Sequence, residues 1–138
     1  MTALFLAALL TAPAMATEPP SLTDALECRL PAAQAETVLA GYGITVDAPA
    51  VQFGTLVTAY GIPVMNIEAT REAGGLHVYY VIAAPALRPF IDAAGMETIG
   101  HGYVRTFLQD RNGLQAINPA EIRKRHANIA PIYCEMRA

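Results

Sequence analysis

The chain has 138 residues, of which 54% are hydrophobic, and a formal net charge of −3 at pH 7. This length fits one domain with a core of its own and is too short for two. The mild negative charge argues against a nucleic-acid partner, because proteins that bind nucleic acids present a basic surface.

The first sixteen residues have the order of an export signal. They carry no charged side chain, and an apolar run over residues 3–10 leads through a proline to the small residues Ala14 and Ala16. This pattern predicts a signal peptide at residues 1–16, cleaved after Ala16, and a single domain at residues 17–138. An uncleaved anchor is the alternative, but a spanning helix needs about 20 apolar residues and this run is shorter. We therefore expect a periplasmic or secreted protein with no transmembrane segment after processing.

The two cysteines, Cys28 and Cys134, lie near the two ends of the processed chain. In an oxidising compartment a single pair of cysteines most simply forms one disulfide, which would tie the termini together. Closing a loop of this length contributes about 4–5 kcal/mol in the chain-entropy model. Two buried free thiols are the alternative. A metal site is disfavoured, because neither cysteine has a second Cys or His at ligand spacing.

Helical signals come first along the processed chain. Ser21, with Asp24 three residues later, can cap a short helix, although residues 22–29 could instead be an extended lead-in. Pro31 suits the first position of an alanine-rich helix over residues 31–40, which ends at the glycines that follow.

A β-rich region follows. Residues 50–60 are apolar and β-branched but contain Gly54, which predicts a bent or bulged strand. Residues 62–72 and 76–84 flank the turn sequence Ala73–Gly75 and predict a hairpin.

Alternation along this hairpin divides its side chains between two faces. One face would carry Met65, Ile67, Ala69, Leu76, Val78, Tyr80 and Ile82. The other would carry Asn66, Glu68, Thr70, His77, Tyr79, Val81 and Ala83. A one-residue slip would exchange the faces, so the assignment depends on register. If the first face packs under helices, the second mixes aromatic, histidine and carboxylate groups, as interface hot spots do. The predicted binding residues are Asn66, Glu68, His77 and Tyr79. The alternative is that a second layer covers this face and makes Tyr79 part of the core.

The last third of the chain predicts a helix, a hairpin, a helix and a strand. Residues 85–95 form a short helix that Gly95 ends. Residues 102–109 and 114–118 form a hairpin whose turn contains Asn112 and Gly113, residue types that accept positive φ.

A helix cap followed by a proline predicts the last helix, and an apolar run predicts the last strand. Asn118 caps a helix that has Pro119 at its first position and runs to about Ala127. Residues 132–136 form the last strand, which carries Cys134 into the sheet. The sum is an α+β fold: a mostly antiparallel sheet of about five or six strands, two or three short helices on one side, and one disulfide.

Side chains suited to catalysis are sparse. Ser21 is the only serine and both cysteines are assigned to the disulfide, so a nucleophilic pair has no well-placed candidate. No phosphate-binding loop, dinucleotide fingerprint or HExxH motif is present. His77, His101 and His126 are too scattered to predict a metal site. We therefore predict no catalytic residue, no metal site and no cofactor.

The basic run at residues 123–126 has two interpretations. Cations in the last turn of a helix are favoured by the helix dipole, each by about 0.3–1 kcal/mol, and this structural role is the simpler one. The alternative is contact with an anionic partner or a lipid headgroup.

These features predict an exported, disulfide-bonded binding or accessory module of a bacterial-type cell envelope, with a protein or small-molecule partner. One alternative is a small periplasmic hydrolase or metal-dependent enzyme that uses His101 or His77 with nearby carboxylates. A self-associating structural protein of the envelope is the third hypothesis.

Processing and oxidation can be tested together by intact mass spectrometry of the protein from its native host. We expect the mass of residues 17–138 less two hydrogens, because cleavage follows Ala16 and the two thiols are oxidised. Thiols that react with an alkylating reagent in denaturant would exclude the disulfide. A mass that retains Met1 would exclude the cleaved export signal.

Overall fold

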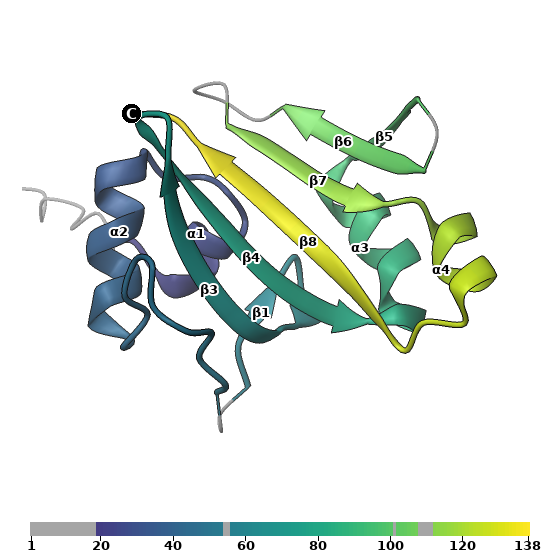
Figure 1. Cartoon of the computed structure of the whole chain (residues 1–138), viewed down its shortest axis with the longest axis horizontal. Helices are drawn as coiled ribbons and strands as arrows, with labels where there is room; N and C mark the ends of the chain where they lie inside the picture. Colours follow the sequence, from purple (N-terminus) through teal and green to yellow (C-terminus); the bar gives the residue numbers. More distant parts are fainter. Residues whose placement is uncertain (1–18, 54–55, 101, 108–111) are drawn as a thin grey trace, which may run out of the picture.

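The computed structural model describes residues 19–53, 56–100, 102–107 and 112–138 (Figure 1). Its centre is a six-stranded antiparallel sheet in the order β3-β4-β8-β7-β6-β5, with a separate two-stranded sheet, β1-β2. The helices gather on one face of the large sheet and at one end of it. The α+β fold and the mostly antiparallel sheet predicted from the sequence are therefore confirmed.

The bounds of the elements are as follows. The strands are β1 (Thr58–Ala59), β2 (Ile62–Pro63), β3 (Met65–Glu72), β4 (Gly75–Ala83), β5 (Glu97–Ile99), β6 (Tyr103–Phe107), β7 (Gly113–Ile117) and β8 (Ile129–Met136). The helices are α1 (Leu22–Leu26), α2 (Ala32–Gly41), α3 (Leu87–Ala94) and α4 (Pro119–Arg125), and a 3-10 turn, η1 (Ala84–Ala86), leads into α3. None of the helices in the described part of the chain is long and apolar enough to cross a membrane.

The helix ends confirm the capping signals of the sequence. Ser21 and Asp24 form a reciprocal capping box at the start of α1, and Gly95 ends α3 with a left-handed backbone. At the start of α4 the side-chain oxygen of Asn118 accepts a hydrogen bond from the backbone N–H of Ala120 at 2.9 Å. These interactions join residues a few positions apart, so these three helix ends are specified locally.

The helix-covered face of the sheet forms the core. Leu76, Val78, Tyr80 and Ile82 of β4 are all buried, as their alternation predicts. The hydroxyl of Tyr80 donates to the carbonyl of Leu26 at 2.6 Å, which ties the end of α1 to the sheet. Burial raises the pKa of Tyr80 well above its usual range, so this donor keeps its proton at neutral pH.

A β-bulge reverses the predicted orientation of Met65. Met65 pairs with Val81 and Glu68 pairs with Tyr79, so the register shifts by one residue between these pairs. The bulge lies at Asn66, whose φ of 50° is in the left-handed region. Met65 is consequently 41% exposed and does not share the buried side of the strand with Ile67 and Ala69. The assignment of Met65 to the core face is wrong.

Two further strand predictions need correction, and one strand was missed. Residues 50–60 do not form one strand: Val51 makes an isolated bridge to Ile67, β1 has only two residues, and Gly54 lies outside the described residues. The three-residue strand β5 was not predicted. The last strand begins at Ile129, so Pro131 lies within it. Pro131 is tolerated because the pairing of β8 with β7 reaches only to Ile132, which leaves one side of the strand unpaired there.

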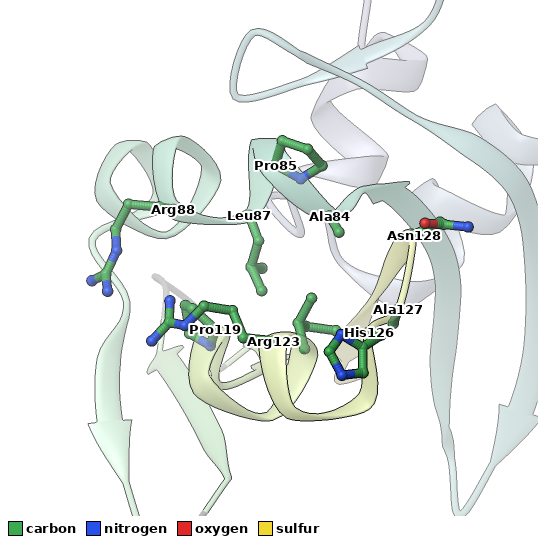
Figure 2. Close-up of a pocket in the computed structure, with 10 residues that line it drawn as sticks. Ala84, Pro85, Leu87, Arg88, Pro119, Arg123, His126, Ala127 and Asn128 are labelled. Atoms are coloured by element: carbon green, nitrogen blue, oxygen red, sulfur yellow. The ribbon is translucent and has the colours of Figure 1, made fainter.

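The start of α3 and the end of α4 meet at one end of the sheet (Figure 2). The backbone N–H of Ala84, in η1, donates to the carbonyl of Asn128, which follows α4, at 2.9 Å. This contact joins the segment after β4 to the segment before β8 and fixes the spacing of the two helices there.

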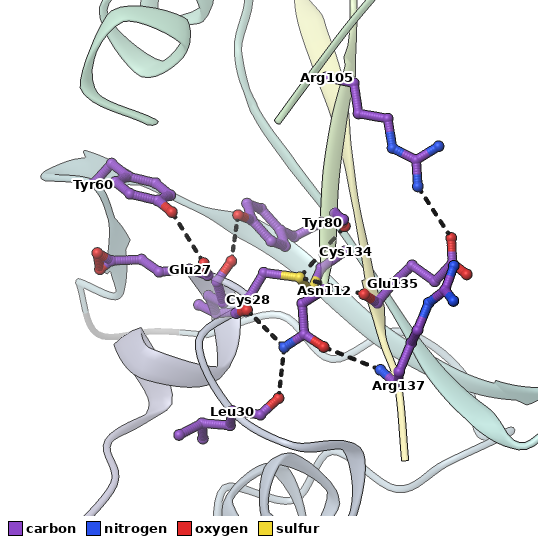
Figure 3. The surroundings of a disulfide bond; sticks show 12 residues. Glu27, Cys28, Leu30, Tyr60, Tyr80, Arg105, Asn112, Cys134, Glu135 and Arg137 are labelled. Atoms are coloured by element: carbon purple, nitrogen blue, oxygen red, sulfur yellow. Dashed lines mark hydrogen bonds and ion pairs between the residues drawn. A yellow bond between two sulfur atoms is a disulfide. The ribbon is translucent and has the colours of Figure 1, made fainter. Parts of the chain in front are cut away.

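The disulfide between Cys28 and Cys134 is confirmed, and it joins the loop after α1 to β8 rather than the chain ends themselves (Figure 3). Cys28 has a left-handed φ of 65°, which is unusual for a residue other than glycine, asparagine or aspartate. The surrounding contacts hold this conformation in place.

Asn112 was predicted to be a turn residue, but its side chain instead binds the loop that follows α1. Neither Asn112 nor Gly113 has a positive φ. The Asn112 side chain is buried, with 1% exposed, and its amide nitrogen donates to the carbonyls of Cys28 at 2.9 Å and Leu30 at 2.8 Å. Its amide oxygen accepts from the backbone N–H of Arg137 at 3.1 Å. The hairpin of β6 and β7 is confirmed, but this residue serves a tertiary contact.

Asn112→Ala is expected to destabilise the protein by about 3 kcal/mol or more, because it leaves three backbone groups unpaired at about 1–3 kcal/mol each. Asn118→Ala, which removes only a helix cap, should cost about 0.5–2 kcal/mol. Denaturant unfolding of both variants and the wild type measures the difference.

Asn112→Asp is the matched control for shape, because it retains an acceptor for Arg137 and loses both donors. It should therefore destabilise at least as much as Asn112→Ala, because a buried carboxylate oxygen would face the carbonyls of Cys28 and Leu30. Equal and small effects of the changes at positions 112 and 118 would contradict the assigned role of Asn112.

Candidate functional site

The side of the large sheet that faces away from the helices is here named the open face. It includes Glu68, Thr70, His77, Tyr79, Val81, Glu97, Ile99, Tyr103, Arg105, Gln115, Pro131, Tyr133 and Glu135, together with Met65 and Glu72. These residues are half-buried or exposed, whereas Gly113 and Ile117, on the same side of β7, are buried. Tyr79 is therefore not part of the core, and among the described residues no second layer covers the middle of this face.

The register of the sheet places six residues in one row across the open face. Glu68 pairs with Tyr79, Tyr79 with Tyr133, Tyr133 with Gln115, Gln115 with Arg105, and Arg105 with Glu97. The rings of Tyr79 and Tyr133 meet edge to face, with centroids 5.1 Å apart and planes at 87°. This is a favourable aromatic geometry, and it fixes both rings at the middle of the face.

His77 lies beside the tyrosine pair. Its Nδ1 atom is 3.3 Å from the hydroxyl of Tyr79 and 3.3 Å from a carboxylate oxygen of Glu72. Burial, and then the negative charge of Glu72, raise the pKa of Tyr79 above its usual value. Tyr79 therefore stays neutral at physiological pH and presents a hydrogen-bonding hydroxyl.

Gly113 opens space on the open face. A Cβ atom at this position would lie 2.6 Å from a guanidinium nitrogen of Arg105, so only glycine lets that side chain lie across β7. The guanidinium of Arg105 reaches Glu135 on the far strand at 3.5 Å. A shallow depression of about 200 Å³ remains between this pair, His77 and the two tyrosines.

The chemistry available on the open face is hydrogen bonding, aromatic contact and charge. His77 with Glu72 and Tyr79 could pass a proton, but neither serine nor cysteine lies in this cluster. Ser21 caps α1 and both cysteines form the disulfide. Within the described ranges no three side chains of His, Cys, Asp or Glu come together as metal ligands.

The structure brings together three of the four predicted binding residues. Glu68, His77 and Tyr79 share the open face, whereas Asn66 sits at the bulge beside them. His101, the other histidine considered for catalysis, lies outside the described residues, and His126 ends α4. Sequence reasoning missed Arg105, Tyr133 and Glu135, because their place depends on strand order. The glycine that opens the face was visible but was assigned to a turn.

Comparison of the chain with protein-family models, with curated proteins and with solved structures finds no match. The function must therefore be inferred from the surfaces of the molecule itself.

The two adjacent tyrosines of β4 provide a test of the open face. Tyr79→Ala should change the free energy of unfolding by about 1 kcal/mol or less, because Tyr79 is only partly buried. Tyr80→Ala should cost about 3 kcal/mol or more, because Tyr80 is 1% exposed and bonded to α1. Chemical denaturation measures both. Equal and large losses would mean that the sheet is buried on both faces.

Proposed function

We propose that the chain is an exported, disulfide-bonded binding module of the cell envelope and that it takes a protein partner on the open face. In this proposal residues 1–16 are removed as a signal peptide and residues 17–138 act as a single domain. The disulfide supports an oxidising compartment, since such bonds are rare in the cytosol.

The observation that carries the proposal is the composition of the open face. Tyr133 is 37% exposed and Met65 is 41% exposed, and each belongs to a cross-strand row on this side of the sheet. Met65 pairs with Val81, and Val81 pairs with Pro131, so an apolar row runs beside the tyrosine row. Fixed aromatic rings next to apolar groups are typical of the centre of a protein interface.

The size of the depression favours a protein over a small molecule. Small-molecule pockets usually measure about 300–1,000 Å³ and enclose most of the ligand. The depression beside His77 is about 200 Å³ and open, so it suits one protruding side chain of a larger partner.

The charges of the open face indicate the chemistry of that partner. Among the described residues of this face, only His77 pairs with Glu72 and no cation pairs with Glu68, while Glu135 is paired with Arg105. The face is thus acidic along the β3 edge. We expect the partner to place apolar groups over the tyrosines and lysine or arginine opposite the carboxylates, since complementary charges steer association.

Site-specific photo-crosslinking tests this assignment. A photoreactive phenylalanine analogue replaces Tyr133 in one version of the protein and Gln34, an exposed residue of α2, in the other. On irradiation in the native envelope, we expect one discrete protein adduct from position 133 and none of that mass from position 34.

Competition then identifies the tyrosine contact. Wild-type protein should suppress the adduct, and the Tyr79→Ala variant should be a competitor weaker by about tenfold or more, as for an interface hot spot. An adduct of twice the chain mass would show that the open face binds a second copy of this chain and not a different protein. Equal adducts from both positions, or equal competition by the variant, would reject the open face as the binding surface.

A further inference from the structure

A separate cleft lies between the start of α3 and α4, away from the open face. It measures about 880 Å³, within the usual range of small-molecule sites. One wall is η1 with the first residues of α3, and the other is α4 with the two residues that follow His126. The hydrogen bond from Ala84 to Asn128 joins the two walls, so the width of the cleft is set by the backbone.

The floor of the cleft is apolar. Leu87 of α3 and Ile122 of α4 are both buried, and Ala84 and Ala127 are half-buried beside them. In Figure 2, Leu87 points into the space between the two walls. Because Leu87 and Ile122 are almost fully covered, Ala84, Ala127 and the lining prolines Pro85 and Pro119 supply most of the hydrocarbon surface that a ligand meets.

The rim of the cleft is cationic. Arg88, Arg123 and His126 line it and are exposed, and no aspartate or glutamate is among its described lining residues. In Figure 2 the guanidinium groups of Arg88 and Arg123 lie toward one end, with His126 and Asn128 toward the other. Neither arginine makes an ion pair or a side-chain hydrogen bond with another described residue, which sets them apart from Arg125, paired with Glu121.

The helix dipole explains only part of this charge. Arg123 and His126 stand at the end of α4, where a cation is favoured. Arg88 is the second residue of α3, at the positive end of its dipole, and no acidic residue occupies that first turn. A cation there is electrostatically disfavoured, and Asp92, one turn further along α3, makes no ion pair with it. A negatively charged ligand between Arg88 and Arg123 would compensate both.

We propose that this cleft binds a small amphipathic anion, in which a carboxylate or similar group lies between Arg88 and Arg123 and an apolar chain lies over Leu87 and Ile122. Charge complementarity specifies the head group, because the cleft offers donors without a competing carboxylate. The apolar floor specifies the chain, because burying methylene groups there removes them from water. This site is independent of the open face and of the partner proposed for it.

Calorimetric titration of the full processed, oxidised protein with octanoate tests the proposal. We expect one octanoate per chain. Hexanoate and butanoate should bind progressively more weakly, by up to about fourfold per methylene removed. Octanol, which has the chain without the charge, should bind at least about tenfold more weakly than octanoate. Equal binding of octanol and octanoate would overturn the role of the arginines.

Matched charge variants locate the head group. Arg88→Gln and Arg123→Gln should each weaken octanoate binding by about tenfold or more. Arg125→Gln removes one positive charge from α4, the helix that contains Arg123. Arg125 pairs with Glu121 and does not line the cleft, so this variant should bind octanoate as tightly as the wild type does. Equal weakening by all three variants would indicate a general charge effect and reject the site. Circular dichroism confirms that each variant is folded.

A vesicle assay distinguishes a free amphiphile from a membrane surface. The protein is sedimented with vesicles of phosphatidylglycerol, and we expect it to remain in the supernatant. Sedimentation that is lost in Arg88→Gln and Arg123→Gln, together with no binding of octanoate, would assign the arginines to lipid headgroups and overturn the proposed small-molecule site.

Discussion

The loop that follows α1 depends on donors supplied from elsewhere in the fold. A helix end leaves carbonyl groups without partners, and these must be satisfied when they are buried. Here Tyr80 donates to Leu26, Tyr60 donates to Glu27, and Asn112 donates to both Cys28 and Leu30. The disulfide closes the same loop onto β8. These hydrogen bonds and the disulfide together hold Cys28 in its left-handed conformation and offset the strain of that conformation.

Both proposed surfaces follow from how few helices the chain contains. α1, α2 and α3 bury their apolar residues against one side of the sheet. Of the described helices only α4 reaches the other side, where it lies beside Tyr103 and Ile117. Most of the opposite side must therefore contact water or a partner. α4 contributes one buried residue, Ile122, so its remaining surface is available to form the cleft with α3. The two surfaces have opposite charge, which suits them to different ligands.

Sequence reasoning succeeded where an interaction is local and failed where it is not. The capping box at Ser21, the cap at Asn118 and the stop at Gly95 each involve residues a few positions apart, and all were predicted. Met65 was assigned to the wrong face because the extra residue of the β-bulge in β3 reverses the alternation of side chains between the two faces of the sheet. Asn112 is a residue type common in turns, but its amide nitrogen donates to carbonyls more than eighty residues away in sequence. The row containing Tyr133 and Arg105 could not be predicted, since it requires the order of the strands.

The place of β8 in the sheet has a consequence for the order of folding. Among the described strands it is the last in sequence, yet it lies between β4 and β7 and joins the β3-β4 hairpin to the β5-β6-β7 meander within the sheet. Neither half can complete the sheet until residues 129–136 are present. Closing such long-range pairs is entropically costly and slows folding. A chain synthesised from its N-terminus therefore cannot join the two parts of the sheet until residues 129–136 have been made, and only then can the thiols of Cys28 and Cys134 meet.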